Sequence, residues 1–213
     1  MLHMASLRNS ESVGSRAAER RAAAVGPSAA VATDPVLAAG YDVLLDVGPG
    51  KATMAEVARR AGISRMTLYR RHDQMRTLIS EVLTAELAVV MADSVANAGQ
   101  APGPARVADI ATGAARAIAE HPLMLRLIEL DPATLLPLLV TRRGSTQRAA
   151  ESILADVLAS EPGLVLDAEA DVVARTIVTA ASAFVFTESL ARAEGVAGDR
   201  WPQFHRMIEG YLT

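Results

Sequence analysis

Cysteine is absent from the 213 residues, which excludes disulfides, thiolate nucleophiles and cysteine-ligated zinc. The four histidines, at positions 3, 72, 121 and 205, are scattered, and no His or acidic pair has the spacing of metal ligands on a helix. A Gly-rich phosphate loop is missing too. The sequence therefore offers no catalytic constellation and no metal site. We expect a protein that is not an enzyme and carries no cofactor.

Long apolar runs are also missing, since no run approaches the roughly 18 residues that a membrane-spanning helix needs. Residues 1–33 contain no apolar stretch of a secretory signal, and a transit peptide is the lesser alternative. The lack of cysteine fits a reducing compartment. We expect a soluble, cytoplasmic protein without a membrane partner, in which 51% hydrophobic residues can form a substantial core.

Lysine is almost absent, with Lys51 the only one, and the other basic residues are arginines. The net charge of −3 is unevenly distributed, because residues 1–78 carry 11 Arg or Lys against 7 Asp or Glu, whereas residues 79–213 carry 10 against 17. Within the first part, residues 51–71 hold six basic residues and a single acid, Glu56. A basic patch in an acidic protein is typical of a region that faces nucleic-acid phosphates.

Apolar residues recur at helical spacing, and period-two alternation bounded by hairpin turns is absent, so the sequence predicts an all-α fold. Glycine and proline breaks separate the expected helices. These helices cover 36–47, 54–61, a short stretch after Ser64, 74–96, 105–119, 123–130, 133–142, 145–160, 168–192 and 201–212. The segments 123–130 and 133–142 could also be one kinked helix.

Five positions of one short segment match the packing of a helix-turn-helix, in which two short helices cross steeply. The first helix needs a small residue at the crossing, here Ala58, and the turn needs a residue that tolerates a left-handed backbone, here Gly62. Leu68 anchors the second helix, and Val57 and Ile63 fill the space between the two. Because all five occur at the required separations inside the basic segment, the sequence predicts a DNA-binding helix-turn-helix.

The residues around this motif resemble the tetracycline-repressor (TetR) family of bacterial transcription regulators. The shared pattern is a Thr-led helix from Thr53 to Ala58, then Ala-Gly-Ile-Ser at 61–64, then Leu68-Tyr69 closing the recognition helix. The preceding helix, Val36 to Val47, also looks like the family's first helix. The resemblance implies a three-helix DNA-binding domain at 34–80, with its helix-turn-helix at about 53–72, and a helical ligand-binding and dimerisation domain at 81–213.

The sequence departs from the family pattern at two positions. Family members usually carry an aromatic residue three positions after the Tyr, where this chain has His72. They usually carry a Lys six positions after it, where this chain has Met75. That Lys usually contacts a DNA phosphate, so the contact is in question here, and Arg76 is the candidate replacement.

The front of a recognition helix enters the major groove, so its first residues are the expected base readers. Arg65 can donate two hydrogen bonds to guanine, and the methyl groups of Met66 and Thr67 can contact thymine. Phosphate contacts, which set the register on DNA, are expected from Thr53, Ser64, Tyr69, Arg70 and Arg71. For Arg59 and Arg60, a solvated face is as reasonable as a phosphate contact.

Residues 1–33 mix Ser, Ala, Arg and Gly without sustained periodicity, which predicts a flexible arm. Arg16, Arg20 and Arg21 lie shortly before the first expected helix, as do minor-groove arms in other helix-turn-helix proteins. The arm therefore either adds DNA affinity or is a tail without a role.

Five of the seven aromatic residues fall in the last 30 positions. Four residues share one stripe of the last helix (Trp201, Phe204, Ile208 and Tyr211), and core packing alone would explain their spacing. The family resemblance favours instead a symmetric four-helix interface between two copies, formed by the last two helices. The interface residues expected on this basis are Ile177, Ala181, Phe184, Trp201, Phe204, Ile208 and Tyr211.

The middle helices of TetR-family proteins enclose a pocket for a small effector. Proline and glycine breaks within 105–160 would leave room between helices here. The candidate lining residues, each of which could also be ordinary core, are Met124, Leu125, Ile128, Leu135, Leu138, Ile153 and Phe184. Because few of the surrounding residues are charged, we expect an apolar or amphipathic ligand.

Together these observations favour a homodimeric, sequence-specific transcriptional regulator that binds a palindromic double-stranded DNA operator. The resemblance implies a repressor that a small apolar effector releases. One alternative is a helical ligand-binding or interaction protein with a non-functional helix-turn-helix, which the missing Lys at Met75 permits and the retained Arg65, Arg70 and Arg71 argue against. Another is a helical enzyme, for which the sequence lacks the chemistry.

Overall fold

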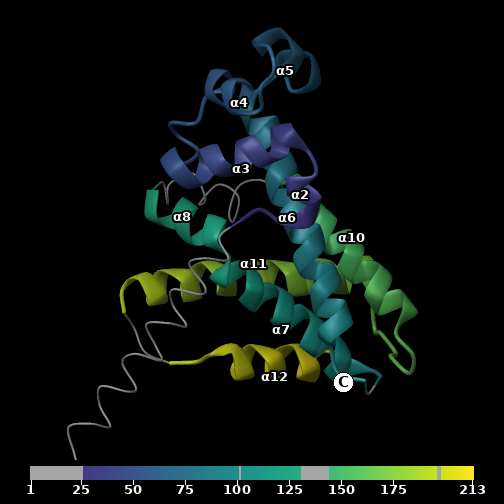
Figure 1. The fold of residues 1–213 in the computed structure, drawn as a ribbon. Helices are drawn as coiled ribbons and strands as arrows, with labels where there is room; N and C mark the ends of the chain where they lie inside the picture. Colours follow the sequence, from purple (N-terminus) through teal and green to yellow (C-terminus); the bar gives the residue numbers. More distant parts are fainter. Residues whose placement is uncertain (1–25, 101, 131–143, 196–197) are drawn as a thin grey trace, which may run out of the picture.

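The computed structural model describes residues 26–100, 102–130, 144–195 and 198–213. Within these ranges the chain is helical, with no strand, so the predicted all-α fold is confirmed. Figure 1 shows α4 and α5 at one end of the molecule, α7, α11 and α12 towards the other, and the long helix α6 running between them. The helices are α2 (Ala29–Ala32), α3 (Pro35–Val47), α4 (Met54–Arg60), α5 (Arg65–Arg71), α6 (Met75–Asn97), α7 (Pro104–Glu120), α8 (Pro122–Leu130), α10 (Ser145–Ser160), α11 (Ala170–Ala193) and α12 (Trp201–Tyr211).

The helix boundaries follow the sequence signals closely, because the capping residues occur where the chemistry needs them. Asp34 precedes Pro35, and its Oδ1 accepts hydrogen bonds from the backbone N–H of Val36 at 2.9 Å and of Leu37 at 3.3 Å. These bonds satisfy N–H donors that the first turn of α3 leaves free. Pro35, at the first helical position, has no N–H group that would need a partner. The helix expected at 133–142 lies outside the described residues.

The segment before α3 differs from the expected flexible arm. Most of that arm, residues 1–25, lies outside the described residues. Its last part forms the short helix α2, for which the Ser28 side chain accepts from the Val31 amide at 3.4 Å. Val31 is fully buried against α3 and α6, so this single apolar residue fastens the segment to the first core. The sequence prediction missed it because one buried residue gives no periodicity.

Three groups of buried apolar side chains form the core. The first lies among α3, α4, α5 and α6, and it also includes Leu123, Leu127 and Ile128 of α8. The second joins α7, α10, α11 and α12 around Phe204. The third and smallest lies among α6, α7 and α10, where Ile110 is fully buried. Helix α8, which follows α7 in sequence, therefore shares its core with the helix-turn-helix.

One helix, α11, is long and apolar enough to cross a membrane by length and composition alone, with a mean hydropathy of 1.4 over Ala170–Ala191. Arg175 and Glu188 interrupt its apolar residues, so this helix is not a continuous apolar run of the kind that the sequence lacks. One side of α11 packs in the second core through Val173, Ala174 and Ile177. A core helix of a globular protein passes the same test, so this observation is weak evidence for a membrane span.

Candidate nucleic-acid interface

Helices α4 and α5 adopt the predicted helix-turn-helix. Ala58 of α4 is buried at the crossing, and Leu68 of α5 is fully buried. The amide of Ile63 donates to the Ala58 carbonyl at 3.0 Å. Gly62 has φ of +67°, the left-handed backbone that the turn requires and that side chains disfavour. The structure thus confirms the packing roles assigned to these residues from sequence.

The two helices begin at hydroxyl caps. Thr53 Oγ1 accepts from the Glu56 amide at 3.3 Å, and Ser64 Oγ accepts from the Thr67 amide at 3.1 Å. The Ser64 and Thr67 hydroxyls are also 2.8 Å apart. These contacts fix both helix N-termini, and they leave Thr53, Ser64 and Thr67 exposed at the end of the molecule where α4 and α5 lie (Figure 1). Helix N-termini with free amides are suited to phosphate contacts.

The residues expected to contact DNA from α5 form an exposed surface. Met66 is 80% exposed and Tyr69 is 52% exposed, although both are large and apolar in part. Arg65 and Arg70 are exposed as well, and neither makes an ion pair within the described ranges. Apolar side chains held in solvent beside uncompensated guanidinium groups have the composition of a nucleic-acid contact surface.

Two arginines of α4 are compensated by acids. Arg59 contacts Glu56 at 2.6 Å, and Arg60 contacts Glu56 at 2.8 Å and Asp46 at 2.6 Å. Hydrogen bonds from Arg59 and then Arg60 lower the pKa of Glu56 to about 2, so its carboxylate is ionised at neutral pH. The structure therefore shows Arg59 and Arg60 paired with acids on the protein surface, and a phosphate contact of either residue stays a prediction.

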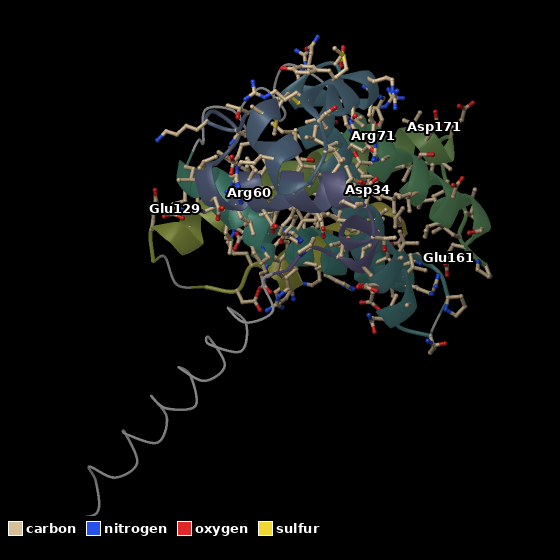
Figure 2. The ribbon with its side chains drawn as sticks, turned by 45° about the horizontal axis from the view of Figure 1, so that its top comes forward. Asp34, Arg60, Arg71, Glu129, Glu161 and Asp171 are labelled. Atoms are coloured by element: carbon tan, nitrogen blue, oxygen red, sulfur yellow. The ribbon has the colours of Figure 1, made fainter. Side chains whose placement is uncertain are left out.

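Arg71 is also compensated, unlike its neighbour Arg70. Its Nη2 atom contacts Asp34 Oδ2, and the same atom lies 3.3 Å from Glu81 Oε1 on α6. Figure 2 shows Arg71 and Asp34 as labelled neighbours on one side of the molecule. The hydrogen bond from Arg71 is the main cause of the lowered pKa of Asp34. Arg71 thus joins the end of α5 to the start of α3 and to α6.

The two departures from the family pattern have different structural outcomes. His72 is buried, with Nδ1 at 3.4 Å from Glu81 Oε2, but neither ring nitrogen makes a hydrogen bond among the described residues. It fills the space that an aromatic side chain would fill. Met75 packs half-buried on the first core, whereas Arg76 is exposed and donates to Gln74 Oε1 at 3.1 Å. Arg76 is therefore available on the surface next to the position of the missing Lys.

The candidate pocket residues that the structure describes are divided among different cores. Met124 and Ile128 belong to the first core, Ile153 borders the third, and Phe184 belongs to the second. Leu125 is half-buried on α8. Leu135 and Leu138 lie outside the described residues. Two shallow clefts, of about 360 and 350 Å³, occur instead in the helix-turn-helix region, beside Arg70 and beside Arg65 respectively.

Most of the expected dimer residues are buried inside a single chain. Phe204 is fully buried, Trp201, Ile208 and Ile177 are nearly so, and Phe184 stacks on Phe204 with ring centroids 4.6 Å apart. The Arg200 guanidinium carbon lies over the Phe184 ring, 4.7 Å from its centroid. Core packing therefore accounts for Trp201, Phe204, Ile208 and Ile177, which are buried within one chain, whereas the assignment of the half-buried Phe184 to the interface stays a prediction. Tyr211 remains exposed, and Ala181 is half-buried.

A buried polar junction that the sequence did not reveal joins the two ends of the molecule. Glu86 of α6 is buried and accepts from the Ser28 amide at 2.9 Å and lies 3.3 Å from His121 Nε2. Burial opposes ionisation of Glu86, but the bonds from His121 and Ser28 outweigh it and lower its pKa. Burial, followed by the charge of Glu86, raises the pKa of Tyr41 to about 12. The partners are far apart in sequence, so no local motif marks them.

A second contact spans the same region. The Arg126 Nε on α8 donates to the carbonyl of Leu45 on α3 at 2.8 Å. Gly48, which ends α3 with φ of +73°, lies so close to Leu130 that an added Cβ would be 3.0 Å from its side chain. Helix α8 is thus fixed to the end of α3 by a hydrogen bond and by close packing.

Comparison with known families places residues 36–82 in the bacterial regulatory proteins of the tetR family. Uncharacterised HTH-type transcriptional regulators of Mycobacterium bovis and Mycobacterium tuberculosis H37Rv are 41% identical to this chain over 56 residues. The match covers 26% of this chain and 30% of each relative, so this chain matches less than a third of either relative's length.

Solved structures extend the likeness in fold to most of the chain. The Rhodococcus erythropolis TetR-family repressor QsdR gives a TM-score of 0.66 at 20% identity, over 84% of this chain and 94% of that one. A Streptomyces coelicolor TetR-family regulator gives 0.56 at 14%, over 87% and 97%. The Dietzia TetR-family repressor AlkX gives 0.55 at 22%, over 82% and 95%. The helix-turn-helix at residues 36–82 thus matches the tetR family of bacterial regulatory proteins, and the likeness of the rest of the chain to these structures is one of fold.

Proposed function

We propose that this protein is a cytoplasmic, homodimeric repressor that binds a palindromic DNA operator through residues 34–80 and receives an effector in residues 81–213. The observation that carries the proposal is the exposed front of α5, where Arg65 and Met66 extend into solvent from a helix capped by Ser64. A recognition helix docks with this end towards base edges. Two such helices about 34 Å apart would read successive major grooves, which is why the operator is palindromic.

Within this surface, Arg65, Met66 and Thr67 read bases, and Thr53, Ser64, Tyr69 and Arg70 hold phosphates. Arg65 lies in the first turn of α5 and lines the cleft between α4 and α5, where a guanine edge can reach it. One turn later, Arg70 lines the cleft of about 360 Å³, and Tyr69 next to it is exposed. Phosphate contacts set the orientation of the protein on DNA and carry no sequence information.

A gel-shift titration with DNA from upstream of the protein's own gene tests the function directly. Arg65→Ala should weaken operator binding by about 1–3 kcal/mol and relax the preference at one base pair in each half-site. The matched control, Arg70→Ala, should weaken operator and random DNA alike and reduce the salt slope by about 0.9. If the wild type binds neither DNA, the alternative of a ligand-binding protein with a non-functional helix-turn-helix is favoured.

The dimer interface proposed here uses the outer faces of α11 and α12, since their inner faces are buried. On α11 the exposed face carries Val172 and Ala183, and on α12 it carries Met207 and Tyr211. The two helices lie roughly parallel in Figure 1, so their outer faces can form one surface. Exposed apolar faces of this kind are typical of interfaces between copies.

Met207→Glu tests this interface without disturbing the core, because the side chain is 49% exposed. We expect monomers in sedimentation and loss of operator binding, since one half-site alone is weak. Val165→Glu is the control, because Val165 is exposed in the loop between α10 and α11. It should leave both the dimer and the DNA affinity unchanged. A wild type that sediments as a monomer at micromolar concentration contradicts the proposal.

The effector is proposed to be apolar or amphipathic and to weaken DNA binding. The third core is apolar, and Ile153 of α10 borders it. Helix α6, which contributes to this core, also follows the recognition helix α5 directly in the chain. An effector that binds the conformation unable to dock on DNA more tightly, by about 1–3 kcal/mol, would suffice, and bound DNA must weaken the affinity for the effector by the same factor. A thermal-shift screen with medium-chain fatty acids and related compounds, followed by operator titration, tests this. A tight ligand that leaves operator affinity unchanged would show an uncoupled site.

A further inference from the structure

Arg71 ends the recognition helix, and two carboxylates from different elements bind it. Asp34 lies at the start of α3, and Glu81 lies in the second turn of α6. Arg70, the preceding residue, is also exposed on the same helix but makes no ion pair in the described ranges. Two adjacent arginines of one short helix thus have different surroundings. Sequence patterns alone would assign both to phosphates.

We propose that Arg71 is a positioning residue and not a phosphate ligand: with Asp34 and Glu81 it fixes the C-terminal end of the recognition helix against α3 and α6. This inference rests on the proposed DNA-binding function. One guanidinium with two carboxylates leaves the group of three with a net negative charge. Such a group repels DNA phosphates, whereas it holds three helices in a fixed relation.

The recognition helix needs this support because it is short and few of its side chains are buried. α5 has seven residues, and Leu68 is the only one of them that is buried. Helices this short are not stable alone and depend on tertiary contacts for their position. The buried Leu68 fixes the middle of the helix, and the Ser64 cap fixes its start. The contact of Arg71 with Asp34 and Glu81 fixes the last residue of the helix, next to His72, which is buried.

Asp34 is suited to this role because its two oxygens act separately. Oδ1 accepts from the Val36 and Leu37 amides and caps α3, whereas Oδ2 contacts Arg71. The arginine is the main cause of the lowered pKa of Asp34, so the carboxylate stays charged at neutral pH. Glu81 likewise contacts Arg71 through Oε1 while its Oε2 lies 3.4 Å from the buried His72. Each acid thus holds the end of α5 and a second group.

Asp34→Asn separates the two roles of Arg71 because they predict opposite signs. Asparagine caps a helix about as well as aspartate, so α3 is retained while the partner of Arg71 loses its charge. If Arg71 positions the helix, operator affinity falls roughly 3- to 30-fold, the range expected for coupled residues, and affinity for random DNA is unchanged. If Arg71 is a phosphate ligand, the loss of a negative charge instead tightens binding to both DNAs.

A salt titration and a double-mutant cycle complete the test. Arg71→Ala should lower operator affinity by a similar factor without changing the salt slope, whereas Arg70→Ala should reduce the slope by about 0.9. The double variant Arg71→Ala with Asp34→Asn should bind no more weakly than either single variant, because both remove the same contact. Arg71→Lys should recover part of the affinity. A slope reduced by about one unit in Arg71→Ala overturns the inference.

Amide exchange of the full chain without DNA gives a readout that does not depend on binding. Residues 65–72 should exchange faster in Asp34→Asn, while α11 and α12 are unaffected. Unchanged exchange together with unchanged operator affinity overturns the inference. Failure of the wild type to prefer operator over random DNA would instead contradict the proposed function, so the two failures are distinguishable.

Discussion

The two ends of the molecule differ in the interactions that surround their functional residues. In the helix-turn-helix, side chains at the surface form arginine–carboxylate contacts, such as Arg60 with Asp46, and few large side chains are buried in α5. At the other end, α7, α11 and α12 pack around three neighbouring aromatic rings, of which Phe204 is completely buried. The first arrangement leaves a charged surface free for a ligand such as DNA, whereas the second contributes mainly stability.

The difference also explains why only the first end has a readable sequence motif. Helix-turn-helix residues interact within about 20 positions of the chain, so their spacing is constrained and visible. The aromatic residues Phe184, Trp201 and Phe204 share a core with α7, which lies more than 60 positions earlier in the chain. Their spacing shows that a face is buried but not what covers it.

The largest effect that we expect concerns the aromatic end. Phe204→Ala removes a fully buried ring that stacks on Phe184, and it should lower the free energy of unfolding by about 3–5 kcal/mol. Urea titration followed by both far-ultraviolet circular dichroism and Trp201 fluorescence measures it. If the two ends are separate cooperative units, part of the circular dichroism signal, from the helices of the other end, should remain at the urea concentration where the Trp201 fluorescence changes. Coincident transitions would show that one core holds both ends, and the comparison above would then describe composition only.

The next effect tests the junction between the ends. Glu86→Gln keeps the shape but removes the charge that His121 and the Ser28 amide contact, so it should cost about 1–3 kcal/mol at pH 7. Because the folded-state pKa of Glu86 lies below 4.5, its contribution is full above that pH and is lost as the pH falls through the lowered value. The stability difference between wild type and variant should therefore shrink below pH 4.5. A difference that stays constant down to pH 3 would contradict an ionised Glu86.

The sequence predicted the fold and part of the site, and residues such as Thr53, Ser64 and Gly62 show why. Their roles are local, since each acts on amides or backbone within three positions. The sequence predicts a phosphate contact for Arg71, but its partner Asp34 is 37 positions away, and no spacing rule connects them. The same reason explains why Trp201 and Phe204 were assigned to a partner copy.

A matched pair of glycines compares backbone strain at the two ends. Gly62 has φ of +67° and no atom within 4 Å of an added Cβ, so Gly62→Ala should cost about 1–2 kcal/mol from the backbone alone. Gly210 lies within α12 with equally open space, and Gly210→Ala should stabilise the chain by about 0.5–1 kcal/mol. Thermal unfolding of both variants measures the two signs. Equal destabilisation in both would mean that Gly210 is held by a contact such as a second copy.

The smallest effect on stability is expected at Glu56, where the consequence is for DNA. Its carboxylate contacts Arg59 and Arg60, and its pKa of about 2 means that it is charged at every pH at which the protein would meet DNA. Exposed pairs of this kind contribute little to folding, so Glu56→Gln should leave the unfolding midpoint unchanged. The variant removes a negative charge beside the proposed interface and frees two arginines for phosphates.

Affinity for operator and random DNA should therefore rise together in Glu56→Gln, with a salt slope steeper by about 0.9 for each arginine that reaches a phosphate. The ratio of the two affinities should not change, because phosphate contacts carry no sequence information. Glu129→Gln is the control, since that acid pairs with Arg126 on α8, outside the helix-turn-helix. It should alter neither affinity nor slope. If Glu56→Gln weakens binding, then Glu56 orients Arg59 or Arg60 for DNA, and the acid contacts of this end support the interface in the way proposed for Asp34 and Arg71.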